Sequence, residues 1–256
     1  MPALAVVGAL IVGVSWYLDP DVGPGRYGAS ATENGHPSAG VEAADAPLGT
    51  PIDVPAHGGT HAFSSTQLES GRPVAYDPCR PIHYVVRPDN APWGGDALLR
   101  ESFDRVTSIT GLQFVLDGPT DEQPSRDRAS FQPDRYGDRW APVLITWETA
   151  QENTELIRNA GLAGSASVGL PGEPRVYVTG TVVLDAADFE QMLAMPNGWE
   201  LARSVVLHEV GHLAGLDHVN DPTQLMYPES GMARDYATGD LTGLAQLGQG
   251  QCVPGL

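Results

Sequence analysis

The chain has 256 residues, which is enough for one ordinary domain with additional segments. Its 32 acidic residues against 14 basic ones give a formal net charge of -18, and every basic residue is arginine. Such a charge repels phosphate backbones and argues against binding to nucleic acid. We interpret the acidity as a contribution to solubility, with selection of basic substrates as the alternative.

The N-terminus carries an apolar run from Ala3 to Trp16. The run is shorter than the ~20 residues that span a membrane, but it matches the apolar core of a signal peptide. No basic residue precedes it and no clean A-x-A cleavage site follows it, so a short membrane anchor fits as well. We therefore predict that residues 1–18 direct the protein outside the cell or to its surface. A buried N-terminal helix is the alternative.

Residues 19–72 are rich in Gly, Pro, Ala, Ser and acidic side chains, and they show no hydrophobic periodicity. Such a composition does not bury enough apolar surface to form a core, so we expect a flexible linker. His57 and His61 occur in a glycine-rich stretch of this linker. Their spacing would allow a metal contact, but histidines in such a setting are usually solvated.

Regular structure is predicted to begin at 81–86, where β-branched and aromatic residues form a short strand. A helix should follow, capped by Asp96 and ended by Gly111, with another strand from Leu112. Three apolar residues repeat along one face of that helix and should enter the core: Leu99, Phe103 and Val106.

Two further strands are expected to begin at Pro142 and Arg175. A charged, proline-containing stretch at 117–139 is predicted to be a long surface loop. The stretch at 160–172 contains mostly Gly, Ala and Ser, and we predict a second loop there.

The next helix should begin at a capping box formed by Asn197 and Glu200, and it carries the run HEVGHLAGLDH. His208 and His212 are four residues apart, so both imidazoles project from one face and can bind a single ion. Glu209 lies to the side of this pair, where its carboxylate can act as a general base toward a water on the metal.

Gly215 follows three residues after His212, where a helix can end and the chain can turn sharply. His218 can then return to the same ion as a third ligand. Three imidazoles leave the fourth position to water, which is typical of a catalytic zinc rather than a structural one. The alternative is an amphipathic helix with coincidental histidines.

This run resembles the zinc helix of the matrixins, a family of metzincin metalloproteases, which reads H-E-x-x-H-x-x-G-x-x-H. Eight residues after the last histidine, Met226 stands where the family has its Met-turn, and Tyr227 and Pro228 continue toward the specificity pocket. Residues 237–248 are similar to the family's final helix. The resemblance covers about 73–256, which we expect to be the catalytic domain.

The resemblance implies a mixed α/β (α+β) fold, in which a twisted sheet lies over two long helices. A small irregular C-terminal subdomain ending in a helix would follow, with the cleft between the two parts. It also implies that a peptide substrate lies extended along an edge strand, which we place within Val176 to Leu184.

The sequence departs from animal matrixins at their second, structural zinc site. No histidine occurs between His83 and His208, so we expect that site to be absent. Calcium is left unassigned, because Asp117, Asp121 and Asp185 are explained as well by solvated loops or a helix cap.

The two cysteines, Cys79 and Cys252, lie near the ends of the expected domain. A disulfide between them would stabilise the fold by up to ~4–5 kcal/mol in the chain-entropy model. Two unrelated buried thiols are the alternative. The sequence around Cys79, DPCRPIH, does not match the thiol-based latency segment of the matrixins.

The sequence thus predicts a monomeric, zinc-dependent endopeptidase with one catalytic ion, held by His208, His212 and His218. In this hypothesis Glu209 takes a proton from the attacking water and delivers it to the leaving amine. The substrate would be a protein or peptide of the cell envelope or the extracellular space. A non-catalytic zinc-containing module that binds peptides, and a zinc hydrolase acting on other bonds, are the alternatives.

Overall fold

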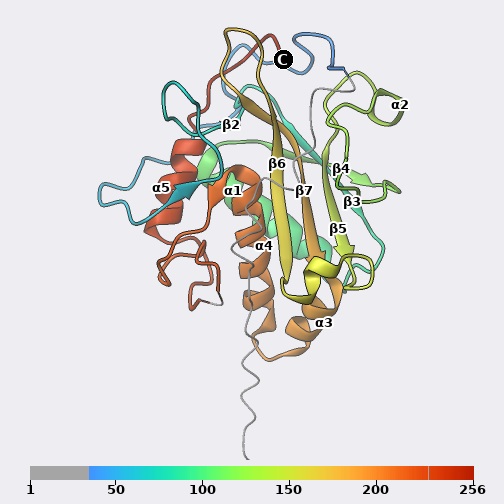
Figure 1. Ribbon diagram of the computed structural model, residues 1–256. Coiled ribbons are helices and arrows are strands. Elements are labelled where there is room, and N and C mark those ends of the chain that lie inside the picture. The colour runs from blue at the N-terminus through green and yellow to red at the C-terminus, as the bar shows by residue number, and fades with distance from the viewer. Residues whose placement is uncertain (1–34, 230) are drawn as a thin grey trace, which may run out of the picture.

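The computed structural model describes residues 35–229 and 231–256 (Figure 1). The predicted signal peptide or anchor at 1–18 lies outside these residues. Within the described part of the chain, no helix is both long and apolar enough to cross a membrane.

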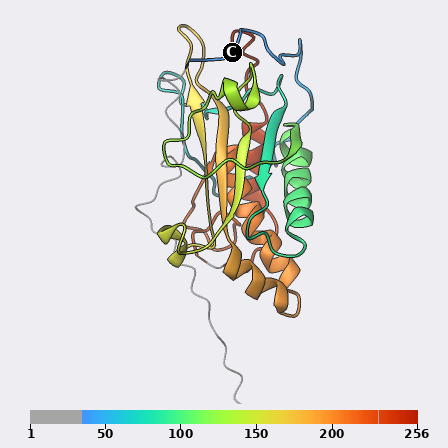
Figure 2. The same cartoon turned by 90° about the vertical axis from the view of Figure 1, so that its right-hand side faces the viewer.

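A mixed sheet and two long helices form the main body of the described chain (Figures 1 and 2). The strands of this sheet are β2 (Ala75–Tyr76), β3 (Ile82–Arg87), β4 (Phe114–Pro119), β5 (Val143–Glu148), β6 (Gly161–Val168) and β7 (Val176–Asp185). Their order is β6-β7-β5-β3-β4, with the short β2 beside the start of β7. All pairs are parallel except β6 with β7. This arrangement confirms the predicted fold class.

Strand β6 occupies 161–168 of the stretch 160–172 that we predicted to be a loop, so the prediction was wrong for most of the stretch. Gly, Ala and Ser have low strand propensity, but here the ladder with β7 and the approach of a helix decide the conformation. Ser165 Oγ donates to the carbonyl of Leu213 at 2.7 Å. A Cβ on Gly180 would lie 2.6 Å from Leu213 Cδ1, so small residues here allow close packing.

The first long helix, α1 (Gly95–Thr110), ends as predicted at Gly111, whose φ of 72° suits glycine. Its N-cap position is taken by Gly94, which makes no side-chain cap, and Asp96 lies within the first turn instead. Asp96 is therefore not the cap, although its charge there favours the helix dipole.

The second long helix, α4 (Gly198–Ala214), begins where predicted, with Asn197 at its N-cap position, but the predicted capping box does not form. Asn197 is left-handed, with φ 60°, and its side chain makes no cap hydrogen bond. The reason is a helix that the sequence analysis missed, α3 (Ala186–Ala194), from which the chain turns directly into α4. Asp185 caps α3 by accepting from the backbone N–H of Asp188 at 2.9 Å.

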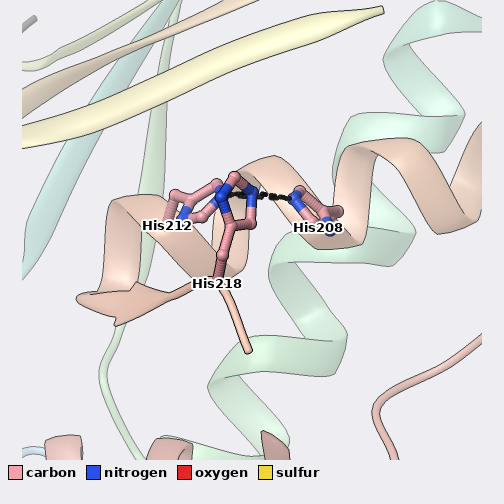
Figure 3. A group of neighbouring side chains, drawn as sticks. All are labelled: His208, His212 and His218. Carbon is pink, nitrogen blue, oxygen red and sulfur yellow. Dashed lines mark hydrogen bonds between the residues drawn. The ribbon is translucent and has the colours of Figure 1, made fainter. Parts of the chain in front are cut away.

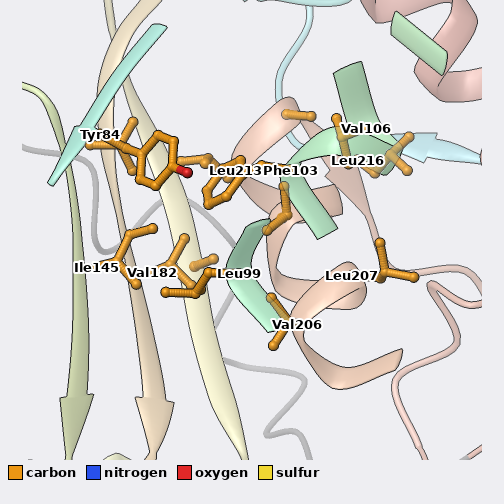
Figure 4. Close-up of a cluster of buried hydrophobic side chains, with 14 of the residues drawn as sticks. Tyr84, Leu99, Phe103, Val106, Ile145, Val182, Val206, Leu207, Leu213 and Leu216 are labelled. Carbon is orange, nitrogen blue, oxygen red and sulfur yellow. The ribbon is translucent and has the colours of Figure 1, made fainter. Parts of the chain in front are cut away.

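The core lies where α1 and α4 pack against each other and against the sheet (Figure 4). Leu99, Phe103 and Val106 of α1 are buried, as their spacing predicts. The Phe103 ring stacks on Tyr84 of β3 with ring centroids 4.4 Å apart. Trp147 of β5 is fully buried beside α1. These contacts fix α4 on the sheet.

Residues 35–72 were expected to be a flexible linker, but they pack along the domain in a defined conformation. Ile52 N donates to the carbonyl of Ile109 at 2.9 Å. Strand β1 (Ala62–Phe63) pairs with β8 (Leu216–Asp217), directly before His218. Most of these contacts use backbone groups, so a composition of Gly, Pro and Ala does not reveal them.

The predicted disulfide between Cys79 and Cys252 is present, with its Cα atoms 5.4 Å apart. Beside it, the buried Arg80 donates to backbone carbonyls of both ends of the described chain, including Val41 and, at 2.7 Å, Leu256. The bond and this arginine together hold the terminal segments on the sheet.

The predicted surface loop at 117–139 is only partly a loop. Strand β4 extends to Pro119, and a short helix, α2 (Pro133–Tyr136), lies within the stretch. The stretch is anchored by a buried ion pair, in which Arg128 Nε and Nη2 donate to Glu122 at 2.8 and 3.0 Å. Tyr136 Oη also donates to Glu122, at 2.6 Å.

Replacing Glu122 by Gln should destabilise the fold at neutral pH by about 3 kcal/mol, because Arg128 would remain buried without its counter-charge. Burial alone would raise the pKa of Glu122, but the hydrogen bonds and charge of Arg128 outweigh it and lower the pKa. The wild type therefore gains stability from this carboxylate above the ordinary pKa of glutamate and loses it as pH falls through the lowered value.

Urea unfolding of the wild type and of Glu122→Gln at neutral and acidic pH measures this effect. The difference between the two proteins should shrink in acid. Glu173→Gln, at an exposed glutamate, is the matched control and should change little. A pH-independent difference would contradict the assigned role of the ion pair.

Candidate metal centre

Helix α4 and the turn after it bring the three predicted histidines together. His208 and His212 lie one turn apart on α4, and Gly215 ends the helix with φ 121°. A Cβ on Gly215 would lie 2.9 Å from Leu247 and 3.2 Å from Tyr177, so the turn has no room for a side chain. Strand β8 then carries the chain back to His218.

The Nε2 atoms of His208, His212 and His218 form a nearly equilateral triangle (Figure 3). Its edges are 3.1 Å for His208–His218, 3.1 Å for His212–His208 and 3.0 Å for His212–His218. Tetrahedral zinc with Zn–N bonds of ~2.0–2.1 Å requires N···N separations of about 3.3 Å. The three nitrogens are therefore positioned to bind one metal ion.

The hydrogen bonds on the opposite ring nitrogens determine which form these imidazoles take. His208 Nδ1 lies 2.8 Å from the carbonyl oxygen of Leu225, and His212 Nδ1 lies 2.9 Å from that of Leu216. Since a carbonyl only accepts, each Nδ1 donates, and each neutral ring presents a bare lone pair at Nε2. Such lone pairs facing each other fit a cation between them.

The electrostatics of the site favour the metal-binding form of the histidines. Burial, together with the neighbouring imidazoles, lowers the pKa of His208, His212 and His218 to about 3 each. The rings are then neutral at physiological pH, and a neutral imidazole is the form that ligates a metal.

Glu209 is buried next to the triad, and its side chain lies against the start of β6. A Cβ on Gly161 would lie 2.6 Å from Glu209 Cγ and 3.0 Å from its Oε1. Glycine at position 161 is therefore required for the Glu209 carboxylate to lie where it does. Burial raises the pKa of Glu209 to about 8.

A cavity of about 100 Å³ opens beside His208 and Glu209, which both line it. Its other walls are mainly apolar and come from α4 and from the segment around Met226; they include Leu201, Val205, Leu225, Tyr227 and Pro228. The metal centre thus borders a hollow that is large enough for one side chain.

Met226 is buried beneath α4. A Cβ on Gly211 would lie 2.8 Å from the Met226 sulfur, so the thioether packs against the helix next to His212. Its carbonyl accepts from Val219 N at 3.0 Å, which ties this segment to the chain just after His218.

Sequence reasoning missed Asp240, a buried residue near the start of α5 (Thr238–Leu247). Its carboxylate accepts from the N–H groups of Leu225, Met226 and Ala237 at 2.7, 3.3 and 2.9 Å. Leu225 in turn accepts from His208, so Asp240 positions a metal ligand through one peptide group. An acid in the first turn of the predicted final helix was the available signal.

The remaining candidates do not join the centre. His61 Nδ1 lies 3.2 Å from the carbonyl oxygen of Gly59. In the described chain, no cluster of side chains that could bind a metal ion includes His57 or His61. Asp117 pairs with His83 and Arg139, and Asp121 pairs with Arg135. Since Asp185 caps α3, none of the three aspartates gives reason to assign calcium.

Comparison with known proteins bears on the metal. Residues 129–247 match the matrixin family model. Archaemetzincin from Methanopyrus kandleri is structurally similar, with a TM-score of 0.31 and 13% identity over 64% of this chain and 84% of that one. No curated protein sequence matches significantly. The matrixin match supports a metzincin-like domain and, in general terms, a zinc metallopeptidase.

Replacing Asp240 by Asn should weaken zinc binding by about 10-fold, because the loss of its charge loosens the Leu225 peptide that orients His208. Competition with a zinc-sensitive chelating dye measures the affinity. Asp235→Asn is a matched control, since Asp235 holds the same segment through Arg105 and Arg203 but bonds neither Leu225 nor Met226. Equal losses of zinc affinity in both variants would show that Asp240 stabilises the segment in general and does not specifically position His208.

Proposed function

We propose that this chain is a zinc-dependent endopeptidase that hydrolyses peptide bonds of extracellular or cell-envelope proteins. The observation that carries the proposal is the convergence of three histidine Nε2 atoms on one point, beside a buried glutamate that lines a cavity together with His208. A purely structural zinc site generally has four protein ligands and no use for such a carboxylate.

His208, His212 and His218 would hold the ion, and Glu209 would handle the proton. When bound, zinc supplies a Lewis acid and lowers the pKa of a water toward ~7. The Glu209 carboxylate accepts the proton of the attacking water and returns it to the amine that leaves. Burial alone raises the pKa of Glu209 to about 8, and the positive charge of a bound zinc would oppose this rise and favour the carboxylate that accepts the proton.

The substrate-binding strand expected from the sequence, within Val176 to Leu184, needs correction. Strand β7 is flanked on both sides, by β6 on one and by β5 and β2 on the other, so Val176 to Leu184 cannot accept a peptide. Strand β6 is the edge strand next to α4. A peptide added antiparallel to β6 would pass Glu209 at Gly161.

The cavity beside the metal centre would take the side chain that follows the cleaved bond. Its walls of Leu201, Val205 and Leu225 offer apolar contacts, and Tyr227 and Pro228 close one side. An apolar residue at this position of the substrate is therefore expected to be preferred.

Two features of the chain support the proposed envelope or extracellular location. The apolar run from Ala3 to Trp16 has the length of a signal-peptide core. The bond between Cys79 and Cys252 is of the kind that persists in oxidising compartments.

The deciding experiment is cleavage of a mixed peptide library by the purified, zinc-loaded chain, with Glu209→Ala as the variant. Wild-type cleavage should stop with a zinc chelator and return with zinc. Glu209→Ala should keep its zinc and lose at least about 100-fold in kcat/KM, because the proton acceptor is gone. Comparable cleavage by the variant would refute the role of Glu209, and no cleavage by the folded wild type would favour the peptide-binding module.

Gly161→Ala should lower kcat by about 10- to 100-fold with zinc still bound, because the new Cβ displaces the Glu209 carboxylate. It should also lower the thermal stability of the wild type. In the Glu209→Ala background, Gly161→Ala should change kcat and Tm little, since the contacted Cγ, Cδ and Oε1 atoms are absent. A double-mutant cycle of Tm and kcat tests this, and additive effects would contradict it.

A further inference from the structure

A second hollow, of about 340 Å³, lies where the turn 67–72 meets the start of β7 and the end of α5. Arg72 and Arg175 both line it, and no acidic residue does. We call it the arginine pocket. In a chain with a net charge of -18, a hollow lined by two arginines and no acid stands out from the general charge.

The arginine pocket is held in shape by reciprocal hydrogen bonds. Gln67 Nε2 donates to the carbonyl of Arg175 at 2.7 Å, and Gln67 Oε1 accepts from Arg175 N at 3.0 Å. Gln67 N donates to the carbonyl of Arg72 at 2.8 Å and closes the turn. The two arginines are therefore fixed relative to each other by their backbones.

Neither guanidinium group forms an ion pair within residues 35–229 and 231–256. Arg72 Nη2 reaches only a backbone carbonyl, that of Gln249, at 3.4 Å. Arg175 Nη2 donates to the hydroxyl of Ser167 at 2.6 Å. Both side chains thus retain donors for a carboxylate, the group that a guanidinium binds best.

Arg175 connects the arginine pocket, which β6 itself does not line, to the end of the edge strand that is far from Glu209. Strand β6 starts at Gly161, against Glu209, and Ser167, which bonds Arg175, lies near its other end. Six residues of strand span about 20 Å. A peptide antiparallel to β6 would direct its N-terminal part toward Arg175, about four to six residues before the cleaved bond.

We propose that Arg72 and Arg175 bind an acidic side chain of the substrate, four to six residues N-terminal to the cleaved bond. This subsite rests on the proposed endopeptidase function and adds a second recognition point to the apolar cavity. The carboxylate would receive charge-assisted hydrogen bonds from two exposed guanidinium groups whose backbones are held together, whereas an amide of the same shape would receive weaker ones.

The test is a set of peptides that share one cleavage site and carry Glu or Gln at each of the positions three to seven residues before it. For the wild type, Glu at one of these positions should raise kcat/KM by about 10-fold over Gln. The gain should fall as salt is added. Arg72→Gln/Arg175→Gln should lose the gain and cleave the Glu and Gln peptides about equally, and a Tm close to that of the wild type shows that the variant is folded.

Arg100→Gln, at an exposed arginine of α1 that does not line the pocket, is the control and should keep the preference. Equal cleavage of the Glu and Gln peptides by the wild type would overturn the subsite while the endopeptidase proposal stands. Retention of the Glu preference by the double variant would also overturn the subsite and leave the endopeptidase proposal standing. Absence of chelator-sensitive cleavage of every peptide would overturn both proposals.

Discussion

The convergence of three imidazole nitrogens on one point is the constraint on which the structure around α4 depends. Because His208 and His212 donate through Nδ1 to backbone carbonyls, their lone pairs at Nε2 face each other at 3.1 Å. That arrangement is favourable only around a cation. The accepting carbonyls belong to Leu225 and Leu216, both outside α4, so the chain beyond the helix must be in place before an ion is held well. Metal binding and folding of the C-terminal part are therefore coupled.

The C-terminal part meets this requirement with few strands or helices of its own. The described residues between β8 and α5 are irregular, and buried polar contacts take the place of regular structure. Tyr236 Oη donates to the carbonyl of Leu207 on α4 at 2.6 Å. Asp235 receives Arg105 from α1 and Arg203 from α4, and Asp240 receives three backbone N–H groups. An irregular segment fastened in this way can form one rigid wall of a cavity.

The sequence predicted what local spacing encodes and missed what distant contacts decide. The histidine run specifies its own geometry, since residues four apart on a helix must share a face, and Gly215 allows the turn to His218. Strand β6 was missed because its small residues carry no hydrophobic alternation, and its conformation comes from β7 and α4. The order in 35–72 was missed because the backbone makes its contacts. The Asn197 cap failed because α3 leaves no extended residue in front of α4.

Small residues in β6 connect these observations into one account of recognition. They let α4 come close enough for Glu209 to lie on Gly161, while the edge of β6 away from β7 has no strand partner in the described residues. That edge runs from Gly161, at the apolar cavity, to the region of Ser167, which bonds Arg175 of the arginine pocket. Charges separated by more than ~10 Å are largely screened in physiological salt, so the net charge of -18 acts weakly on a bound peptide. The position of a single acid relative to the arginine pocket, and not the total charge of the peptide, is therefore the basis of selection.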